Sequence, residues 1–416
     1  MERSVEPSYL KGHIKAPPSK SMTQRAIAAA LLADGQTTIT GPSYCDDSLA
    51  AMGIADALGA IVERDGDSLR ITGGGELKET TLNCGESGLA IRMFSPIAAL
   101  NPAEITMSGT GSLKKRPMFM IKEALDQLGV ICVTNDGFLP LIIQGPVKGG
   151  NCEIDGSVSS QLLTGLLMAL PGAENNSEIR VSNLKSKPYI DMTVQVLQEF
   201  GISVSNDNYS LFRIAGKQKY KPRIYEVEGD WSGGAFLLVA GAVNGQLRIS
   251  GLRTDSYQSD KSIMTALEKA GVNIIQGDGF IEVSKSHLKA FEFDATESPD
   301  LFPPLVALAA YCNGKTTLKG VSRLIYKESN RATALVEEFG KMGINIEVRD
   351  DYMTITGGRI KGARVSSHGD HRIAMAAAVA ALGAEDKIII EDSDCVAKSY
   401  PGFFDDLRKT GVTIQD

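Results

Sequence analysis

The sequence predicts an α/β fold, with six similar units following one another along the chain. A helix-like run that ends in an apolar residue and a glycine recurs at Gly59, Gly129, Gly201, Gly271, Gly343 and Gly411. These glycines are 70, 72, 70, 72 and 68 residues apart, so units of this size fill all 416 residues. Within a unit, strand patterns alternate with helix patterns, which is typical of the α/β class.

The first unit shows which elements are expected and why. They are, in order, a helix over 21–33, a strand over 37–40, a helix over 46–58 and two strands over 61–64 and 68–71. Ser43, Asp46 and Asp47 are candidate cap and first-turn residues for the second helix, and Gly59 follows it in the C′ position. Asp65-Gly66-Asp67, between the last two segments, is a hairpin signal.

The third and fifth units repeat this order. In the third unit, helices are expected over 159–170 and 189–200, a strand over 178–181, and paired strands around 206–208. In the fifth unit, helices are expected over 301–312 and 329–342, a strand over 316–318, and paired strands around 350–351. The coarse order is β-α-β-α-β-β, and the pattern does not predict how the strands pair.

Composition and charge exclude several classes of protein. Hydrophobic residues are 43% and charged residues 22%, which is ordinary for a soluble globular chain and excludes a disordered or fibrous one. The net charge of −7 argues against a broad basic surface for nucleic acid, although it is compatible with a local cationic pocket. The most apolar stretch, 373–384, has 12 residues. Because a membrane-spanning helix needs roughly 20, no membrane span is expected.

The cysteines indicate a reducing compartment. The chain has six cysteines and no CxxC pair, so we expect reduced thiols and no zinc site. The first ten residues carry no apolar signal segment. We therefore expect a cytoplasmic protein with neither a nucleic-acid nor a membrane partner.

Polar and charged residues gather at the expected helix starts. The first helices begin at or near Lys20, Gly88, Ser160, Asp230, Asp300 and Asp370, and the second helices near Asp47, Arg116, Tyr189, Gln258, Lys327 with Arg331, and Lys398. A helix N-terminus offers unpaired N–H groups and a positive dipole end, which suit phosphate and carboxylate. Capping alone does not explain lysine or arginine, which oppose the dipole, so these positions favour an anion site.

Three short segments carry residue types that an anion site needs. Residues 17–25 form a strand-to-helix junction with Lys20, Arg25 and three hydroxyls. Residues 84–92 open a helix with two glycines, which permit close approach of the backbone to a ligand. Pro117 fits the first position of a helix and would leave Arg116 at the N-cap.

Two further segments favour polar ligands, and a third suggests a metal. Residues 157–161 cluster neutral donors and acceptors that suit a phosphate or a hydroxylated ring, and residues 326–331 combine two cations with a carboxylate. His368, Asp370 and His371 resemble metal ligands. This alternative is weak because the only other histidines are His13 and His287, and no metal is expected.

The order and spacing of the motifs resemble the 5-enolpyruvylshikimate-3-phosphate synthase family, also called 3-phosphoshikimate 1-carboxyvinyltransferases, from about residue 12 to 404. The motifs are PPSKSMTQR, CGESGLAIR, LKKRPM, DGSVSSQ, SKPYIDMT, VEGDWSGGA, SPDLFPP, YKESNR, GDHRIAM and CVAKSYPGF. The resemblance implies two similar domains, each of three βαβαββ units of the inside-out α/β barrel type, with the active site in the cleft between them. It implies one domain at 20–227 and the other at 1–19 with 228–416.

The activity implied by the resemblance is transfer of an enolpyruvyl group. The family moves this group from phosphoenolpyruvate to the 5-hydroxyl of shikimate 3-phosphate and releases phosphate, on the pathway to chorismate and the aromatic amino acids. The resemblance also implies two small-molecule substrates, no cofactor and a monomeric enzyme. Because both substrates carry phosphate and carboxylate groups, several cations are needed despite the negative net charge.

The resemblance also assigns roles to single positions. Residues that match the shikimate 3-phosphate ligands are Lys20, Ser21, Arg25, Ser159, Ser160, Gln161, Ser186, Asp300 and Lys327. Residues that match the phosphoenolpyruvate ligands are Lys20, Gly88, Arg116, Gln161, Arg331, Arg372 and Lys398. Asp300 matches the proposed base and Glu328 the proposed proton donor, and with Lys20 they are the expected catalytic residues. Carboxyl groups suit such proton transfers, and flanking cations would stabilise an anionic intermediate.

A few positions depart from the family pattern. Pro18 stands where glycine is common, Gln24 where asparagine is frequent, Leu89 where threonine usually follows the motif glycine, and Asn330 where aspartate is usual; Glu86 occupies a position that holds either asparagine or glutamate. Leu89 is expected to change the packing beside the phosphoenolpyruvate site.

Three alternatives remain compatible with parts of the sequence. UDP-N-acetylglucosamine enolpyruvyl transferases share the fold and the chemistry, but usually carry a cysteine just before the Arg-Pro pair, and 111–115 has none. A non-catalytic phosphometabolite-binding module would bind anions without turnover, and would not need both Asp300 and Glu328. An RNA-terminus-processing relative would share the unit fold, but the pI of 5.4 argues against it.

Overall fold

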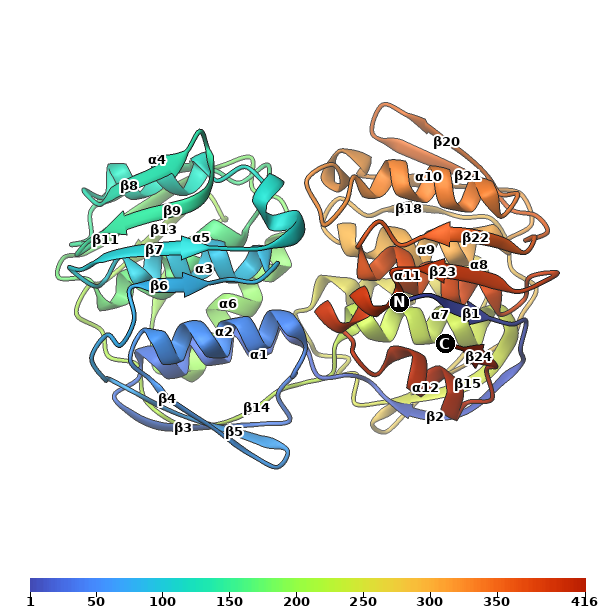
Figure 1. Ribbon diagram of the computed structural model, residues 1–416, viewed down its shortest axis with the longest axis horizontal. Helices are drawn as coiled ribbons and strands as arrows, with labels where there is room; N and C mark the ends of the chain where they lie inside the picture. Colours follow the sequence, from blue (N-terminus) through green and yellow to red (C-terminus); the bar gives the residue numbers. More distant parts are fainter. The chain divides into compact units, whose positions relative to one another are not determined.

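The chain folds into two compact lobes, each with three four-stranded sheets. A computed structural model describes all residues, 1–416 (Figure 1). The continuous lobe is Pro18–Glu228, and the split lobe combines Met1–Pro17 with Gly229–Asp416. The six sheets confirm the six predicted units and the α/β class.

The three sheets of the continuous lobe share one strand order. The first contains β14 (Ile224–Glu226), β3 (Gly35–Thr40), β5 (Ser68–Gly73) and β4 (Ile61–Asp65); the second β6 (Thr81–Asn83), β7 (Glu104–Ser108), β9 (Phe138–Gln144) and β8 (Ile131–Asn135); the third β10 (Asn151–Asp155), β11 (Ser177–Ser182), β13 (Leu211–Ile214) and β12 (Val204–Asp207). In each sheet the first two strands are parallel, and the last two form a hairpin that pairs antiparallel with the second strand.

The split lobe repeats the same order. Its sheets contain β2 (Leu10–Lys15), β15 (Gly245–Ser250), β17 (Phe280–Ser284) and β16 (Asn273–Gly277); β18 (Glu292–Asp294), β19 (Lys315–Lys319), β21 (Tyr352–Thr356) and β20 (Asn345–Arg349); and β22 (Ala363–Ser366), β23 (Ile388–Glu391), β1 (Arg3–Val5) and β24 (Ile414–Gln415). The two lobes are therefore built on one repeated plan.

Three strands come from parts of the chain far from the unit that they complete. β14 pairs parallel with β3, with Ile224 opposite Thr38. β2 pairs parallel with β15, and β1 lies antiparallel between β23 and β24. The N-terminal segment thus completes two sheets of the split lobe, and β14 completes the first sheet of the continuous lobe.

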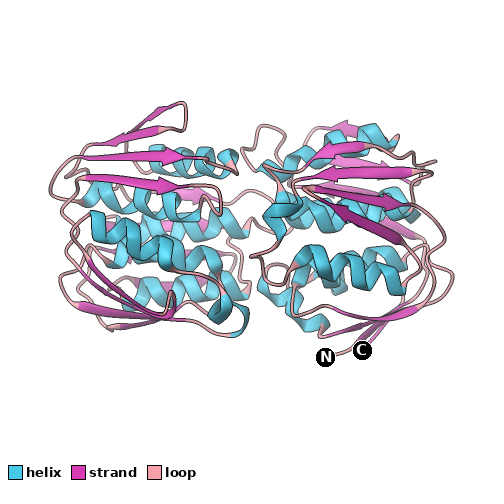
Figure 2. Cartoon of the chain, turned by 90° about the horizontal axis from the view of Figure 1, so that it is seen from above, coloured by secondary structure: helices cyan, strands magenta, loops and turns pink.

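Each lobe has three helices that are buried on nearly every side. They are α1 (Lys20–Leu32), α3 (Gly88–Ala98) and α5 (Gln161–Ala169) in the continuous lobe, and α7 (Trp231–Asn244), α9 (Phe302–Ala310) and α11 (His371–Ala381) in the split lobe. Helices that are apolar all round must be enclosed, and in Figure 2 helices occupy the inside of each lobe with strands outside. Alanine runs, such as 28–30 and 376–378, let these helices pack closely.

The second helix of each unit ends at a recurring glycine. These helices are α2 (Asp46–Ala57), α4 (Phe119–Gln127), α6 (Lys187–Glu199), α8 (Ile263–Ala270), α10 (Arg331–Lys341) and α12 (Phe403–Lys409). The six glycines that follow them have φ between +76° and +114°, a conformation that side chains disfavour. The C′ position predicted for Gly59 is confirmed, and four of the other glycines share it, whereas Gly271 is the C-cap residue of α8. No helix of the chain combines the length and the apolarity that a membrane crossing requires.

The structure differs from the predicted elements mainly in the residues at which helices begin. Helices were expected from residues 159 and 329, but α5 begins at Gln161 and α10 at Arg331, because Ser160 and Asn330 are the N-cap residues. Short 3₁₀ turns account for other differences: η1 (Gly111–Lys115), η2 (Leu170–Gly172), η3 (Ser259–Ser262), η4 (Pro299–Leu301), η5 (Val321–Leu324) and η6 (Ser393–Lys398).

Placing a charge in β1 should unfold the split lobe first. Val5 is fully buried between β23 and β24, so Val5→Asp leaves an unpaired buried carboxylate that costs about 3–5 kcal/mol. The only tryptophan, Trp231, belongs to α7 and reports on this lobe alone. In urea, the fluorescence midpoint should fall while circular dichroism shows a second, later transition. Lys11→Asp, on exposed β2 surface, is the control, and a single shared transition in Val5→Asp would contradict the prediction.

Candidate active site

In the continuous lobe, the N-terminal ends of the three buried helices lie together. The Oε1 atom of Gln24, in α1, accepts a hydrogen bond from Oγ of Ser87, the N-cap residue of α3, at 3.2 Å. The Nη1 atom of Arg92, in α3, donates to Oε1 of Gln161, the first residue of α5, at 3.0 Å. Three positive dipole ends therefore converge. The longer Gln24, in place of the usual asparagine, reaches the cap of the neighbouring helix.

Lys20 is the first residue of α1, where a cation opposes the helix dipole. Its Nζ atom lies 2.8 Å from Oδ2 of Asp47, in the first turn of α2, and both side chains are nearly buried. Ser19 caps the helix by accepting a hydrogen bond from the N–H of Met22. Ser19 thus caps the helix, and the Lys20 ammonium is paired with the carboxylate of Asp47.

Arg25 is fully buried without a carboxylate partner. Its guanidinium donates to Oγ1 of Thr193 at 3.0 Å, to the Ser21 carbonyl at 2.9 Å, and to the Tyr189 carbonyl and Oγ1 of Thr164 at longer distances. Burial lowers the pKa of Arg25 to about 10. A buried cation surrounded only by neutral groups is costly unless an anion joins it, so this position fits a phosphate.

Gly88 is the first residue of α3, and two guanidinium groups lie close to it. A Cβ atom at this position would lie 2.5 Å from Nη1 of Arg116 and 2.9 Å from Nη1 of Arg92. Both arginines and Gln161 therefore meet at Gly88, and only glycine leaves them room. Leu89, one of the departures from the family pattern, is buried in the core of the lobe. Arg92 was missed as a site residue, although it closes the motif at 84–92.

The prediction that Arg116 is the N-cap of a helix is wrong. Arg116 follows η1 in extended conformation, and α4 begins at Phe119 with Met118 as its N-cap residue, so Pro117 is not the first helical residue. A residue before proline is pushed out of the helical region, which explains the extended Arg116. Glu86 holds the turn, because its Oε2 atom accepts hydrogen bonds from N–H and Oγ of Ser112, at 2.9 and 3.0 Å.

The predicted serine ligands lie at the starts of α5 and α6. Ser160 is the buried N-cap residue of α5, and Oγ of Ser159 accepts a hydrogen bond from the N–H of Gln161 at 3.2 Å. Ser186 occupies the N-cap position of α6 in the left-handed conformation, with φ of 57°. The hydroxyls of Ser160 and Ser186 do not cap these helices.

In the split lobe, the site residues gather around Arg331. Arg331 is the first residue of α10 and is fully buried. Its Nε atom donates to Oδ2 of Asp370 at 2.9 Å, its Nη1 atom to Oδ1 of Asp300 at 2.8 Å, and its Nη2 atom to Oε2 of Glu328. These carboxylates raise the pKa of Arg331 despite its burial. Asn330 caps α10 through its amide oxygen, which explains why an aspartate is not required there.

Asp300, in η4, is shared by three cations. Nζ of Lys327 and Nη1 of Arg331 lie 3.0 and 2.8 Å from its Oδ1 atom, and Nη2 of Arg372 lies 3.1 Å from its Oδ2 atom. Burial by itself raises the pKa of Asp300, but the charges of Arg372, Lys327 and Arg331 outweigh it and hold the pKa well below its usual value. One carboxylate and three cations are thus in direct contact where little solvent reaches them.

The segment before α11 brings in the remaining cations. Asp370 caps α11 by accepting a hydrogen bond from the N–H of Arg372 at 3.0 Å. Nζ of Lys398 donates to the Gly369 carbonyl at 2.8 Å. The prediction that Lys398 and Lys327 begin helices is wrong: Lys398 is the last residue of η6, and Lys327 lies between η5 and α10. A 3₁₀ turn carries Lys398 and a bend carries Lys327, so neither lysine is placed by a helix start.

Asp260 is a further acid in this lobe that sequence reasoning missed. It lies in η3, is 1% exposed, and accepts a hydrogen bond from Oγ of Ser232, in the first turn of α7. Burial first, and then the charge of Asp300, raise the pKa of Asp260 to about 6. Its position two residues after Gln258, at a predicted helix start, was the available signal.

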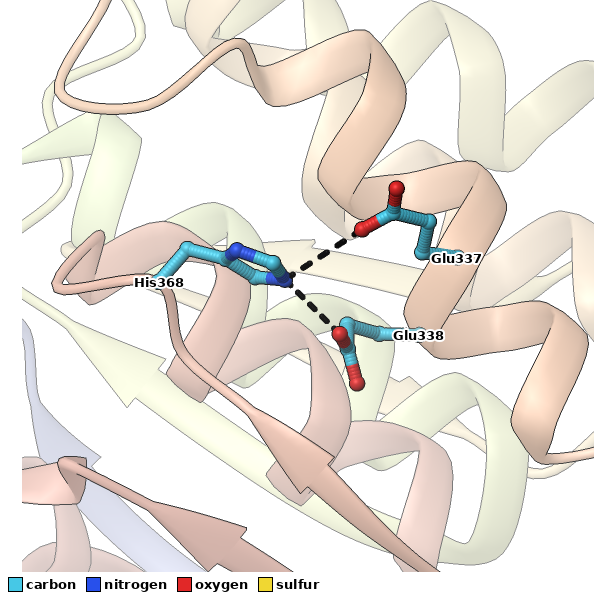
Figure 3. Close-up of side chains that lie close together, drawn as sticks. All are labelled: Glu337, Glu338 and His368. Atoms are coloured by element: carbon cyan, nitrogen blue, oxygen red, sulfur yellow. Dashed lines mark hydrogen bonds and ion pairs between the residues drawn. The ribbon is translucent and has the colours of Figure 1, made fainter.

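The histidines near this cluster do not form the metal site considered from the sequence. His371 is buried and its Nε2 atom lies 2.8 Å from Nη1 of Arg372, while Asp370 is bonded to Arg331. His368 faces Glu337 and Glu338 of α10 instead (Figure 3).

The fold and the two clusters define a class of protein: a two-lobed α/β protein in which each lobe gathers buried cations suited to phosphate and carboxylate groups.

Comparisons with known proteins agree on one family. The model of the EPSP synthase family, described as 3-phosphoshikimate 1-carboxyvinyltransferase, matches residues 5–407. The chain is 38% identical over 417 residues to a 3-phosphoshikimate 1-carboxyvinyltransferase of Clostridium kluyveri, with 99% of this chain and 98% of that one covered. It is 38% identical over 423 residues to the protein of that name from Clostridium botulinum, with the same coverage.

Solved structures share the fold over the full length. An EPSP synthase from Acinetobacter baumannii superposes with a TM-score of 0.85 at 25% identity, with 100% of both chains covered. The enolpyruvyl transferase NikO from Streptomyces tendae has a TM-score of 0.81 at 18% identity, with 100% of this chain and 98% of that one covered, which is a likeness of fold alone.

The chain belongs to the EPSP synthase family. It is a transferase of the shikimate pathway that moves an enolpyruvyl group, on the way to chorismate and the aromatic amino acids. The family uses shikimate 3-phosphate and phosphoenolpyruvate as substrates. The family, fold and activity implied by the sequence motifs are confirmed, and the three alternatives are set aside.

Replacing Asp260 should stabilise the protein most at alkaline pH. A buried carboxyl with a raised pKa keeps its proton in the folded state at a pH where the unfolded chain has lost it, so stability falls as pH rises from about 4 through 6. Asp260→Asn removes this loss, which is on the order of 2–3 kcal/mol above pH 7. The gain in Tm over the native protein should therefore be larger at pH 8 than at pH 5. Asp405→Asn, at an exposed acid, is the control, and an equal gain at both pH values would contradict the assignment.

Proposed function

We propose that the clusters of the two lobes serve one reaction, with Asp300 as the base, Glu328 as the proton donor and Lys20 beside both substrates. The proposed ligands of shikimate 3-phosphate are Lys20, Ser21, Arg25, Ser159, Ser160, Gln161, Ser186, Asp300 and Lys327. The proposed ligands of phosphoenolpyruvate are Lys20, Gly88, Arg116, Gln161, Arg331, Arg372 and Lys398. Arg92 joins the second set, because it meets Arg116 and Gln161 at Gly88.

One observation carries this proposal: Asp300 is in contact with three cations that have assigned ligand roles. Without substrate, these cations neutralise the carboxylate and keep its pKa low, which makes it a poor base. When the carboxylate and phosphate groups of phosphoenolpyruvate attract Arg331 and Arg372, the stabilisation of Asp300 weakens and its pKa rises. Substrate binding therefore switches the carboxylate from counterion to base.

The reaction needs three proton transfers and one leaving group. Glu328 gives a proton to C3 of phosphoenolpyruvate, and C2 becomes electrophilic. The 5-hydroxyl oxygen of shikimate 3-phosphate bonds to C2 while its proton passes to Asp300. The resulting tetrahedral intermediate then loses phosphate from C2, and the phosphate takes up the proton held by Asp300. A proton from C3 returns to Glu328, which regenerates the double bond. Arginine and lysine side chains stabilise the anionic intermediate throughout.

Arg25 supports the assignment of the phosphate of shikimate 3-phosphate to the continuous lobe. Its guanidinium is buried among hydroxyls and carbonyls, so a phosphate supplies the charge that the protein does not. The Ser21 carbonyl that accepts from Arg25 belongs to the start of α1, beside Lys20. Arg25, a helix N-terminus and Lys20, whose ammonium is also paired with Asp47, can then bind one phosphate.

We further propose a monomeric enzyme of the cytoplasm, with one domain at 20–227 and the other at 1–19 with 228–416. Support for a reducing compartment comes from the six cysteines, which are all free. Burial raises the pKa of Cys84, Cys312 and Cys395, which keeps these thiols protonated and unreactive.

The acceptor substrate is tested by phosphate release from phosphoenolpyruvate with purified protein. We expect release with shikimate 3-phosphate and none with UDP-N-acetylglucosamine. Release with the sugar nucleotide, or tight binding of both expected substrates without turnover, would contradict the proposal.

Gly88→Ala should weaken phosphoenolpyruvate binding without unfolding the protein. The new Cβ atom would lie 2.5 Å from Nη1 of Arg116 and 2.9 Å from Nη1 of Arg92, so both flexible arginine side chains must move away. We expect KM for phosphoenolpyruvate to rise about tenfold, equivalent to about 1.4 kcal/mol, and KM for shikimate 3-phosphate to stay within about twofold. Gly53→Ala in α2, where a Cβ meets nothing within 4 Å, is the matched control. Unchanged kinetics in Gly88→Ala would remove these arginines from the site.

A further inference from the structure

Glu338 is a buried carboxylate that has no role in the reaction as described so far. It lies on α10, seven residues after Arg331 and hence on the same side of the helix, and is 1% exposed. Its oxygen atoms accept hydrogen bonds from Nζ of Lys341, at 3.0 and 2.8 Å, and from two groups outside α10. A buried carboxylate that accepts several hydrogen bonds fixes the position of the segment that donates them.

The groups outside α10 belong to the last residue of β22 and to the segment that joins β22 to α11. The N–H of Ser366 donates to Oε2 of Glu338 at 2.9 Å, and Nε2 of His368 lies 2.7 Å from Oε1. Figure 3 shows the imidazole of His368 directed at the two glutamates of α10. His368 has φ of 52°, a conformation that a residue other than glycine adopts at some cost. The bond to Glu338 offsets that cost.

The anchored segment leads directly into the proposed phosphoenolpyruvate ligands. Gly369, next to His368, accepts the hydrogen bond of Lys398 with its carbonyl at 2.8 Å. Asp370 then bonds Nε of Arg331 at 2.9 Å and caps the helix that begins with His371 and Arg372. The segment is thus fixed to α10 twice, through Glu338 at its start and through Arg331 at its end.

We propose that Glu338 and His368 are positioning residues for the phosphoenolpyruvate end of the site. Their contact, together with the bond from Ser366, is called the 338–368 latch below. The latch fixes the backbone of 366–369, and through it the Gly369 carbonyl that orients Lys398 and the start of α11 that orients Arg372. This inference rests on the ligand roles proposed above.

A metal ion is a poor alternative for the same three side chains. Glu337, Glu338 and His368 offer ligand atoms within 4.8 Å of one another. However, Nζ of Lys341 lies 2.8 Å from Oε2 of Glu338, and this oxygen also accepts from the N–H of Ser366. A cation at this point would compete with a positive ammonium group and a backbone donor for the same oxygen. The arrangement therefore suits a hydrogen-bonded latch better than a cation site.

The latch is tested by steady-state kinetics of His368→Gly and Glu338→Gln. Glycine accepts the left-handed backbone easily, so His368→Gly removes the side chain without adding backbone strain. We expect KM for phosphoenolpyruvate to rise about three- to tenfold, KM for shikimate 3-phosphate to stay within about twofold, and Tm to change little. Both substitutions break the same contact, that between Glu338 and His368. KM for phosphoenolpyruvate in the double variant should therefore be no higher than in the more damaging single variant.

Glu337→Gln is the matched control, since Glu337 is the exposed neighbour and its Oε2 atom lies 3.8 Å from Nε2 of His368. An equal effect in this variant, an unchanged KM for phosphoenolpyruvate in His368→Gly, or additive effects in the double variant would overturn the latch. His368→Gly decides the matter alone if Glu338→Gln does not fold. A native enzyme inactive with shikimate 3-phosphate would instead contradict the proposed function, and the two failures are thereby distinguished.

Discussion

The site of the split lobe depends on the ion pairs that Arg331 forms with three carboxylates. Its guanidinium has no exposed surface and bonds to Asp300, Glu328 and Asp370, which come from three different segments. Removing one partner of such a buried network leaves charge uncompensated, which makes the arrangement all-or-none. The expected base, the expected acid and the cap of α11 are therefore placed relative to one another by a single side chain.

The two lobes solve the problem of holding anions in different ways, although their sheets follow one plan. The split lobe pairs its cations with carboxylates, so a substrate must displace an internal counterion such as Asp300. In the continuous lobe, Lys20 is likewise paired with a carboxylate, but Arg25 has only neutral partners, and a phosphate adds the missing charge there directly. We expect the second arrangement to favour tight binding and the first to couple binding to chemistry.

Much of the fold and of the site could be predicted because it depends on local signals. The recurring glycines mark the end of the second helix of each unit, where a positive φ is required, and the motif residues lie close to helix starts. The strand pairing could not be predicted, since β1, β2 and β14 complete sheets far away in sequence. Arg116, Lys327 and Lys398 were placed on helix starts wrongly, because proline and 3₁₀ turns move the helix boundaries. Glu338 carries no sequence pattern of its own, and the only signal for Asp260 was its place near a predicted helix start. Tertiary packing is what makes both of them buried acids.

The central claim is that substrate anions release Asp300 from its cations. It is tested most directly by the pKa of Asp300, followed through the carboxyl ¹³C chemical shift of labelled aspartate and assigned with Asp300→Asn. In the free enzyme this pKa should lie well below its usual value, because Arg372, Lys327 and Arg331 outweigh the effect of burial. With phosphoenolpyruvate and shikimate 3-phosphate bound, the account predicts a clear rise. An unchanged or lower pKa in the complex would show that the cations stay on Asp300, and that another group removes the proton.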